Sequence, residues 1–152
     1  MPFRYRLQSV LRLRRSLEHQ EEQRLFALAA IVNRLRAELG RRQALDLSAR
    51  RAALAEMEEL SGFSSGAQLQ FRARCDAASQ AVIERLKTQL QEAERKRLEQ
   101  LAVYQGARQQ REIFEGLRDH QKEVYDRELA RHEQQANDEA FLLRSFPAPS
   151  QD

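Results

Sequence analysis

Apolar residues recur at alternating spacings of three and four positions over two long stretches of the chain. In the first stretch they are Leu25, Leu28, Val32, Leu35 and Leu39. This spacing places one narrow apolar stripe along an α-helix, which is how two helices pack as a coiled coil. We therefore predict an all-α protein in which two long helices bury their stripes against each other. The second stretch comprises Leu86, Leu90, Ala93, Leu98, Leu101, Tyr104, Ala107, Phe114 and Leu117.

The two stretches are separated by residues 61–66, a segment of three serines, two glycines and one phenylalanine. Gly62 suits the left-handed backbone position that commonly follows a helix end. Ser65 and Gln68 have the spacing of a capping box, in which two side chains satisfy free backbone N–H groups at a helix start. The segment is thus predicted to be a turn, and such a short turn makes the two helices antiparallel.

The predicted helices extend over residues 3–60 and 66–143. No proline occurs between Phe3 and Phe146, and proline is the residue that most strongly ends a helix. We predict a single domain, an antiparallel coiled-coil hairpin, followed by a tail at 145–152 that contains two prolines and should fray.

One register aligns the apolar residues of both helices. Residues that face each other in an antiparallel pair have positions with a constant sum, and here that sum is near 125, as for Leu11 with Phe114 and Leu35 with Leu90. The register that the short turn imposes is therefore also the one that pairs apolar side chains. It further joins Leu7 with Leu117, Leu25 with Leu101, Leu28 with Leu98, Leu39 with Leu86, Leu54 with Phe71, and Met57 with Leu69.

The stripe has two irregularities. Its spacing breaks around residues 40–43 and is expected to resume near Leu47 and Leu54, one residue out of step, which would change the coiling locally. Three arginines also lie near the stripe of the second helix, and we expect their stems to lie along it while their guanidinium groups reach water. These are Arg97, Arg111 and Arg118.

The second helix is predicted to extend beyond the first. In the register near 125, Phe3 faces about Lys122, so residues 123–143 have no partner within the chain. An apolar stripe without an internal partner marks an interaction site; the alternative is a frayed or folded-back end. The apolar residues at helical spacing here are Val124, Tyr125, Leu129, Ala136, Ala140, Leu142 and Leu143.

Charge narrows the range of functions. The chain has 26 basic and 23 acidic residues, a formal net charge of +3, and such mixed charge favours solvated helix faces over a nucleic-acid-binding surface. Residues 1–20 contain five arginines and one acid, Glu18. The acid-free residues 1–17 fit a membrane-surface helix, a targeting segment or the start of the first helix. The third interpretation is favoured, because the register includes Leu7 and Leu11.

The remaining motifs point away from catalysis. The single cysteine, Cys75, is interpreted as a buried small residue, and its lack of a partner favours a reducing cytoplasm. The longest apolar run, residues 26–32, is far shorter than a membrane span, so we expect a soluble or peripheral protein. No phosphate-binding, nucleophile or zinc-binding motif is present. We expect no enzymatic activity, no cofactor and no metal.

The N-terminal residues resemble a known family. Their pattern is Phe3, Tyr5, Leu7, Gln8, Val10, Leu11, Arg14 and Glu18, and it is similar to the N-terminal pattern of the FliJ family of flagellar export proteins. The segment at 137–140 is similar to an acidic signature of that family, although Asn137 stands where the family has an apolar residue. The length and the predicted hairpin agree with this resemblance.

The resemblance implies a role in type III flagellar protein export, and hence in flagellum assembly and motility. FliJ-like proteins are antiparallel coiled coils similar to the central stalk of rotary ATPases. Their paired ends enter the pore of the hexameric flagellar export ATPase, and the region near their turn contacts the membrane export gate. The family is also described as a general chaperone that escorts export chaperones. The resemblance further implies a cytoplasmic protein, peripheral to the cytoplasmic face of the cell membrane at the flagellar base. A hairpin that pairs its own two helices is expected to be monomeric when free.

Two sets of residues are candidates for these contacts. Binding of the ATPase ring is assigned to both chain ends, and binding of the export gate to one face of the second helix beside the turn. The alternatives are a generic structural or tethering coiled coil, the equivalent stalk of a virulence-type secretion system, and a membrane or nucleic-acid binder that uses the N-terminal arginines. The ring candidates are Phe3, Tyr5, Leu7, Tyr125, Leu129, Ala136 and Ala140, and the gate candidates are Phe71, Cys75, Ala78 and Val82.

Overall fold

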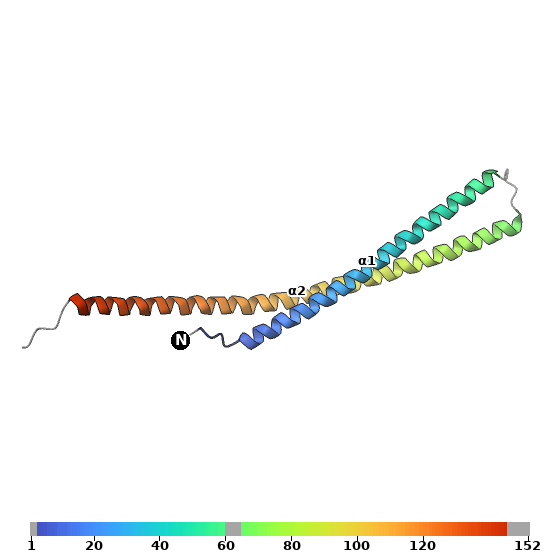
Figure 1. Ribbon diagram of the computed structural model, residues 1–152. Helices are drawn as coiled ribbons and strands as arrows, with labels where there is room; N and C mark the ends of the chain where they lie inside the picture. The colour runs from blue at the N-terminus through green and yellow to red at the C-terminus, as the bar shows by residue number, and fades with distance from the viewer. Residues whose placement is uncertain (1–2, 60–64, 146–152) are drawn as a thin grey trace, which may run out of the picture. The chain divides into compact units, whose positions relative to one another are not determined.

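The computed structural model describes residues 3–59 and 65–145. Over these ranges the chain forms two α-helices and no strand (Figure 1). Helix α1 is Gln8–Glu59 and helix α2 is Gly66–Ser145. The prediction of an all-α protein built from two long helices is confirmed.

The residues group into two units, and both helices contribute to each. The terminal unit comprises residues 1–18 and 106–152, and the turn unit comprises residues 19–105. Within each unit the two helices pack side by side in opposite directions, as the hairpin prediction requires (Figure 1). Most of the predicted turn at 61–66, and the predicted tail after Ser145, lie outside the described residues.

Helix α1 begins five residues later than its predicted start at Phe3. The non-helical segment before it is held by two aromatic contacts. The ring of Phe3 lies 5.7 Å from the ring of Tyr125, and the Tyr5 hydroxyl donates a 3.0 Å hydrogen bond to the carbonyl oxygen of Phe114. Tyr5 and Leu11 are both buried, but their separation is not a whole number of helical turns, so one continuous helix could not bury both.

The start of α2 is the capping box that the sequence predicted. The backbone N–H of Gln68 donates to the Ser65 hydroxyl oxygen at 3.3 Å, and the backbone N–H of Ser65 donates to the Gln68 side-chain oxygen at 3.0 Å. Each side chain thus satisfies a backbone donor that has no partner within the helix. The following N–H, that of Leu69, donates to the carbonyl oxygen of Ser65 at 3.1 Å.

The two helices bury the stripe with the predicted three-and-four spacing. Leu11 and Val32 of α1 are 0% and 2% exposed, and Ala93 of α2 is 8% exposed. In the turn unit, Leu28 and Leu35 line one small cavity together with Ala93. The hydrogen bond between Ser79 and Asp46, whose positions sum to 125, supports the predicted register.

One predicted pair in this stripe is wrong. Leu98 is 58% exposed, so it does not pack against Leu28. The stripe runs through Arg97, four positions after Ala93, and the Arg97 Nε is buried without a hydrogen-bond partner among the described residues. Helical spacing therefore decides which residue faces the partner helix, even where the neighbouring residue is more apolar.

The predicted one-residue shift of the α1 stripe is also wrong. The less exposed positions continue in step through Asp46, Ala53 and Met57. Leu47 and Leu54, which were expected to resume the stripe, are 50% and 62% exposed. The stripe thus keeps its geometry, and part of it becomes polar.

Asp46 replaces an apolar contact with hydrogen bonds. Its side chain is 12% exposed. The Ser79 hydroxyl donates to Asp46 Oδ1 at 2.7 Å, and the Gln80 side chain donates to Oδ2 at 3.1 Å. Arg50 forms a 3.0 Å ion pair with the same carboxylate. These partners satisfy a buried charge that would otherwise be costly, and they fix α1 against α2 at one register.

Candidate interaction surfaces

The C-terminal part of α2 has no partner helix among the described residues. We define the unpaired segment as residues 126–145, in which every residue is exposed. The contacts of the N-terminal segment with α2 extend to Tyr125. Beyond this point the polar contacts stay within α2, as in the 3.1 Å ion pair of Arg127 with Glu123. The predicted overhang is therefore present, and it begins three residues later than expected.

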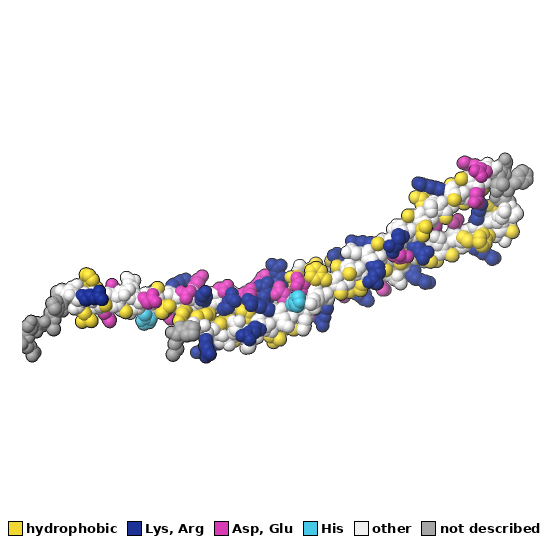
Figure 2. All heavy atoms as spheres, viewed as in Figure 1, with side chains coloured by type: hydrophobic (Ala, Val, Ile, Leu, Met, Phe, Trp, Pro, Cys, Tyr) yellow, Lys and Arg dark blue, Asp and Glu magenta, His cyan; other side chains and the backbone are white. Residues whose placement is uncertain are grey.

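The unpaired segment carries an apolar stripe that continues the buried stripe of the terminal unit. Tyr125, Leu129, Ala136, Ala140 and Leu143 share one side of the helix, because their spacings of three, four and seven are close to whole turns. Leu129 is 44% exposed and Leu143 is 77% exposed. Figure 2 displays apolar side chains along this part of the chain. A stripe that is buried in the paired region and exposed beyond it is a surface that another chain can cover.

Two of the predicted stripe residues belong to a different side. Val124 and Leu142 are 38% and 55% exposed, and their separation of five turns places them together on a side of α2 away from Leu129. The stripe is consequently narrower than the sequence reading suggested. Acidic residues exceed basic ones along the unpaired segment: Asp126, Glu128, Glu133, Asp138 and Glu139 against Arg127, Arg131 and Arg144.

The N-terminal candidates lie at the beginning of this surface. Phe3 is partly buried and its ring contacts the ring of Tyr125, so the structure brings these two candidates together. Tyr5 is only 8% exposed, and its hydroxyl is bonded within the unit. Leu7 is 38% exposed. Tyr5 therefore orders the segment, whereas Phe3 and Leu7 retain surface that a partner can contact.

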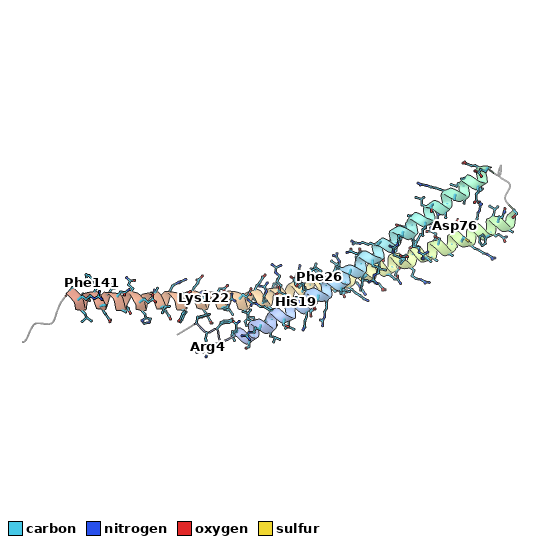
Figure 3. The ribbon with its side chains drawn as sticks, viewed as in Figure 1. Arg4, His19, Phe26, Asp76, Lys122 and Phe141 are labelled. Carbon is cyan, nitrogen blue, oxygen red and sulfur yellow. The ribbon has the colours of Figure 1, made fainter. Side chains whose placement is uncertain are left out.

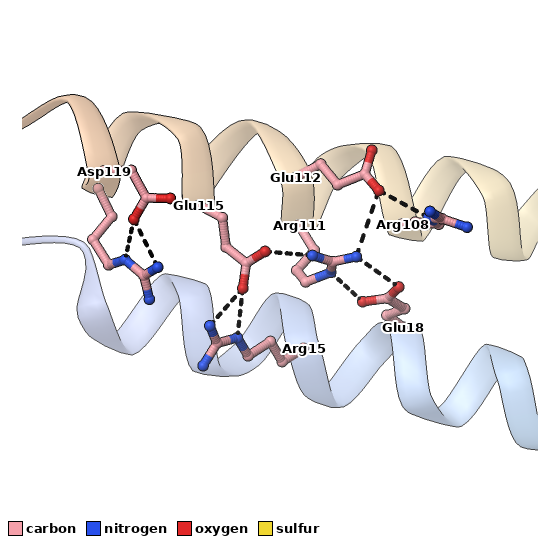
Figure 4. A network of polar contacts seen from close by, with 8 residues as sticks. Arg15, Glu18, Arg108, Arg111, Glu112, Glu115 and Asp119 are labelled. Carbon is pink, nitrogen blue, oxygen red and sulfur yellow. Dashed lines mark hydrogen bonds and ion pairs between the residues drawn. The ribbon is translucent and has the colours of Figure 1, made fainter.

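A network of ion pairs fastens the start of α1 to α2 (Figure 4). Arg15 binds Glu115 with a nitrogen-to-oxygen distance of 2.5 Å, and Arg111 Nε binds Glu18 at the same distance. Arg111 also binds Glu115, and it lies 3.6 Å from Glu112. The expectation that the Arg111 guanidinium reaches water is wrong, because its side chain is only 20% exposed and contacts carboxylates on both helices.

The network shifts the acidity of its members. The hydrogen bond from Arg15, with a further one from Arg111, lowers the pKa of Glu115 below its ordinary value, against the opposing effect of burial. The hydrogen bond to Glu18 raises the pKa of Arg111. Sequence reasoning missed this network, although the signal was present: in the predicted register, Arg111 falls close to Glu18 and Glu115 falls close to Arg15.

The gate candidates lie in the turn unit, where an open groove of about 440 Å³ separates α1 from α2. Phe71 and Cys75 line it from α2, and Leu54 and Met57 line it from α1. Phe71 is 68% exposed. The Arg72 guanidinium joins the two helices here, since it binds Glu56 and the carbonyl oxygen of Ala53, at 2.7 and 3.4 Å.

The other two gate candidates lie outside the groove. Ala78 is exposed and Val82 is 38% exposed, and neither lines the groove with Phe71. Cys75 is exposed, so its interpretation as a buried residue is wrong. The α1 wall of the groove was not among the candidates, although the predicted pair of Leu54 with Phe71 contained the signal for it.

Two further kinds of site are not found in the described part of the chain. Over residues 3–59 and 65–145, no group of three histidine, cysteine or acidic side chains is arranged to hold a metal ion. Over the same ranges, neither helix has an apolar stretch long enough to cross a membrane. The surfaces found are helix faces and an open groove, which suit contacts with other proteins.

The fold and these surfaces define a coiled-coil-like protein of two long helices with an exposed apolar stripe. A family model described as "Flagellar FliJ protein" matches residues 3–148. This match covers nearly the whole chain, so the chain belongs to the FliJ family and is a component of the flagellar protein export apparatus. The resemblance noted from the N-terminal residues is confirmed. Comparisons with curated proteins and with solved structures gave no match.

Proposed function

We propose that this chain is the central stalk of the flagellar export ATPase and that it links the ATPase ring to the membrane export gate. The observation that carries the proposal is the unpaired segment at 126–145, whose apolar stripe continues a buried coiled-coil seam but has no partner among the described residues. A helix with such a stripe is stable in water when a partner covers it. The wall of a ring pore is a partner of suitable form.

The terminal unit would bind the ring. Phe3 and Tyr125 form its first contact surface, and Leu129, Ala136 and Ala140 extend it along the stripe. The acid excess of the unpaired segment implies that the surface facing it carries basic side chains at its edges. Leu7, which is partly exposed, would add to this surface from α1.

The turn unit would bind the export gate. The open groove there exposes Phe71 and Cys75 beside Leu54 and Met57, and large apolar side chains exposed around a groove are typical of a binding surface. Ala78 and Val82 would extend the contact along α2. The Asp46 hydrogen bonds lie in the same unit and hold the two walls of the groove in register.

The remaining parts of the proposal follow from this role. The chain acts without catalytic activity of its own, as a monomer, in the cytoplasm beside the membrane at the flagellar base, and it serves flagellum assembly and motility. Escort of export chaperones would use the same exposed helix faces. The sequence left a generic tethering coiled coil or the stalk of a virulence-type secretion system as alternatives, and the family match favours the flagellar role over both. Unchanged flagellar motility after deletion of the gene would contradict the proposal.

The stripe can be tested with a charge-introducing variant and a matched control. Leu129→Asp combined with Ala136→Asp places two carboxylates on the stripe, and we expect stimulation of the purified export ATPase to fall about tenfold or more, because a charge buried without a partner is costly. Ala130→Asp combined with Leu142→Asp adds the same charge on other sides of the unpaired segment and should leave stimulation near the wild-type level.

Helix content and unfolding temperature, measured by circular dichroism, would establish that both variants remain folded. Equal stimulation by the stripe variant and the wild-type chain would reject the ring-binding role of the stripe. Equal loss of stimulation in both variants would show that the effect is not specific to the stripe side of the helix. It would indicate that added negative charge anywhere on the segment weakens binding.

A further inference from the structure

A cleft of about 830 Å³ lies in the terminal unit between the N-terminal segment and α2. Of its lining residues, the proposed stalk role uses only Phe3 and leaves the charged side chains without a function. Its charged lining consists of five cationic side chains and one acid. Arg4, Arg6 and Arg12 come from the N-terminal side, and Arg118, Asp119 and Lys122 come from α2. Figure 3 shows Arg4 and Lys122 on these two elements.

The single acid of the cleft is already engaged. Arg118 donates through Nε and Nη2 to Asp119 Oδ1, at 2.9 and 2.7 Å. The cations of Arg4, Arg6, Arg12 and Lys122 have no ion-pair or hydrogen-bond partner among the described residues, whereas the neighbouring Arg15 and Arg111 each bind a carboxylate. The cleft therefore gathers four positive charges that no carboxylate of the described chain neutralises.

The backbone that carries these cations is held in place. Tyr5 lies between Arg4 and Arg6, is 8% exposed, and is bonded through its hydroxyl to the backbone of α2. Phe3 packs its ring against Tyr125 on the other side of Arg4. Two anchored aromatic residues thus keep the flanking arginines beside α2, so a ligand need not order this segment when it binds.

We propose that this cleft binds a compact polyphosphate anion, the di- or triphosphate group of a small molecule. Clefts lined by one sign of charge concentrate the field and attract an oppositely charged ligand. Guanidinium groups match phosphate oxygens with two parallel hydrogen bonds, which makes arginine the preferred residue for such recognition. The volume falls in the range of small-molecule sites, and a triphosphate brings a charge that four unpaired cations can balance.

The arrangement favours a compact ligand over an extended one. The cations lie on two elements on opposite sides of one cleft, so a small anion can contact several of them at once. A membrane surface or an extended acidic peptide would lie along one exposed face of a helix. The site adjoins the apolar stripe through Phe3, which lines the cleft and contacts Tyr125. Its charged residues lie outside the stripe, and its test needs no flagellar partner.

The test is calorimetric titration of the full chain with sodium tripolyphosphate and with pyrophosphate at physiological ionic strength. The cleft variant combines Arg4→Gln, Arg6→Gln and Lys122→Gln. We expect its affinity for tripolyphosphate to fall about tenfold or more, since each phosphate contact that is lost removes a charge-assisted hydrogen bond.

The matched control combines Arg34→Gln, Arg51→Gln and Arg85→Gln. These arginines of the turn unit are exposed and have no partner among the described residues, so the net charge changes equally. Tripolyphosphate should bind this control as it binds the wild-type chain, to within about twofold, a difference too small to represent a lost contact.

Three results would overturn the proposal. Absence of binding to the wild-type chain removes the site, and equal weakening in both variants makes the binding a property of net charge alone. Tighter binding of an oligoglutamate peptide, or of vesicles of anionic phospholipid, would assign the cations to an acidic protein segment or to a membrane surface. Circular dichroism spectra of both variants establish that the helices are intact.

Discussion

Arg97 and Arg111 occupy equivalent positions of the α2 stripe, two heptads apart, yet they have different partners. Arg111 binds Glu18 and Glu115, whereas the Arg97 Nε is buried without a hydrogen-bond partner among the described residues. The difference comes from the opposite helix, because the register places Glu18 near Arg111 but Leu28 near Arg97. The consequence of one arginine in the seam therefore depends on a residue far away in the sequence, 93 positions for Arg111 and Glu18.

The lowered pKa of Glu115 makes the stability of the terminal unit depend on pH. A carboxyl group whose folded pKa lies below its unfolded value stabilises the fold at higher pH, and loses this effect as the pH falls through the folded pKa. We expect Glu115→Gln to lower the free energy of unfolding at neutral pH by about 1 kcal/mol. Once the pH falls below 4.5, the ordinary pKa of this carboxyl group, the difference in unfolding free energy between the variant and the wild-type chain should shrink. In strong acid this difference should vanish.

Thermal unfolding followed by circular dichroism at neutral and acidic pH would measure this difference. Glu99→Gln is the control, because Glu99 lies 3.8 Å from Arg95 and is 68% exposed, so its removal should change the unfolding temperature little at either pH. A Glu115 variant that is destabilised equally at neutral and acidic pH would indicate lost packing in place of lost charge.

At the scale of the helices, the sequence predicted the fold better than it predicted which residues lie in the seam. The number of helices, the capping box at Ser65 and the register followed from spacing and turn chemistry. The errors at Leu98 and Leu47 arose because leucine was assumed to mark the seam, whereas helical spacing places Arg97 and Asp46 there.

The late start of α1 was missed for a different reason. It depends on Tyr5 bonding to the backbone of α2, and a contact between residues so far apart leaves no periodic trace in the sequence. The same limit applies to the candidate surfaces. The unpaired stripe could be predicted from the register alone. The α1 wall of the groove could be identified only from the structure, in which both helices are in place.

The register can be tested by crosslinking between the two helices. In a chain carrying Cys75→Ser, the pair Asp46→Cys and Ser79→Cys should form a disulfide within one molecule on mild oxidation, since these two side chains are 2.7 Å apart at their hydrogen-bonded atoms. The pair Leu28→Cys and Leu98→Cys should crosslink poorly, because Leu98 faces solvent.

Mass spectrometry and non-reducing electrophoresis distinguish a disulfide within one chain from one between two chains. A crosslink from 46 to 79 that forms only between chains would contradict the hairpin. Efficient crosslinking of 28 with 98 would contradict the seam described for the turn unit and would restore the pairing that the sequence alone predicted.

At the scale of the whole molecule, the two proposed binding surfaces lie in separate units that share both helices. The stripe of the terminal unit and the groove of the turn unit have no residue in common. A protein that links two partners must bind both at once. A chain that has lost one binding surface still binds the partner of the other surface, but it cannot connect the two partners. Such a chain competes with the wild-type protein.

We therefore expect Leu129→Asp combined with Ala136→Asp to inhibit motility when it is overproduced in motile cells that also make the wild-type chain. The variant retains the groove and would occupy the export gate without reaching the ATPase ring. Adding Phe71→Ala should restore motility, because loss of a large exposed aromatic anchor releases the gate. Adding Phe26→Ala instead should not restore motility. Phe26 is exposed to nearly the same extent as Phe71, 67% against 68%, but it lies outside the groove.

Swimming in soft agar, with protein levels checked by immunoblot, measures motility in each case. Equal relief by both phenylalanine variants would mean that the groove is not the gate-binding surface, and absence of inhibition would mean that the chain does not join two partners.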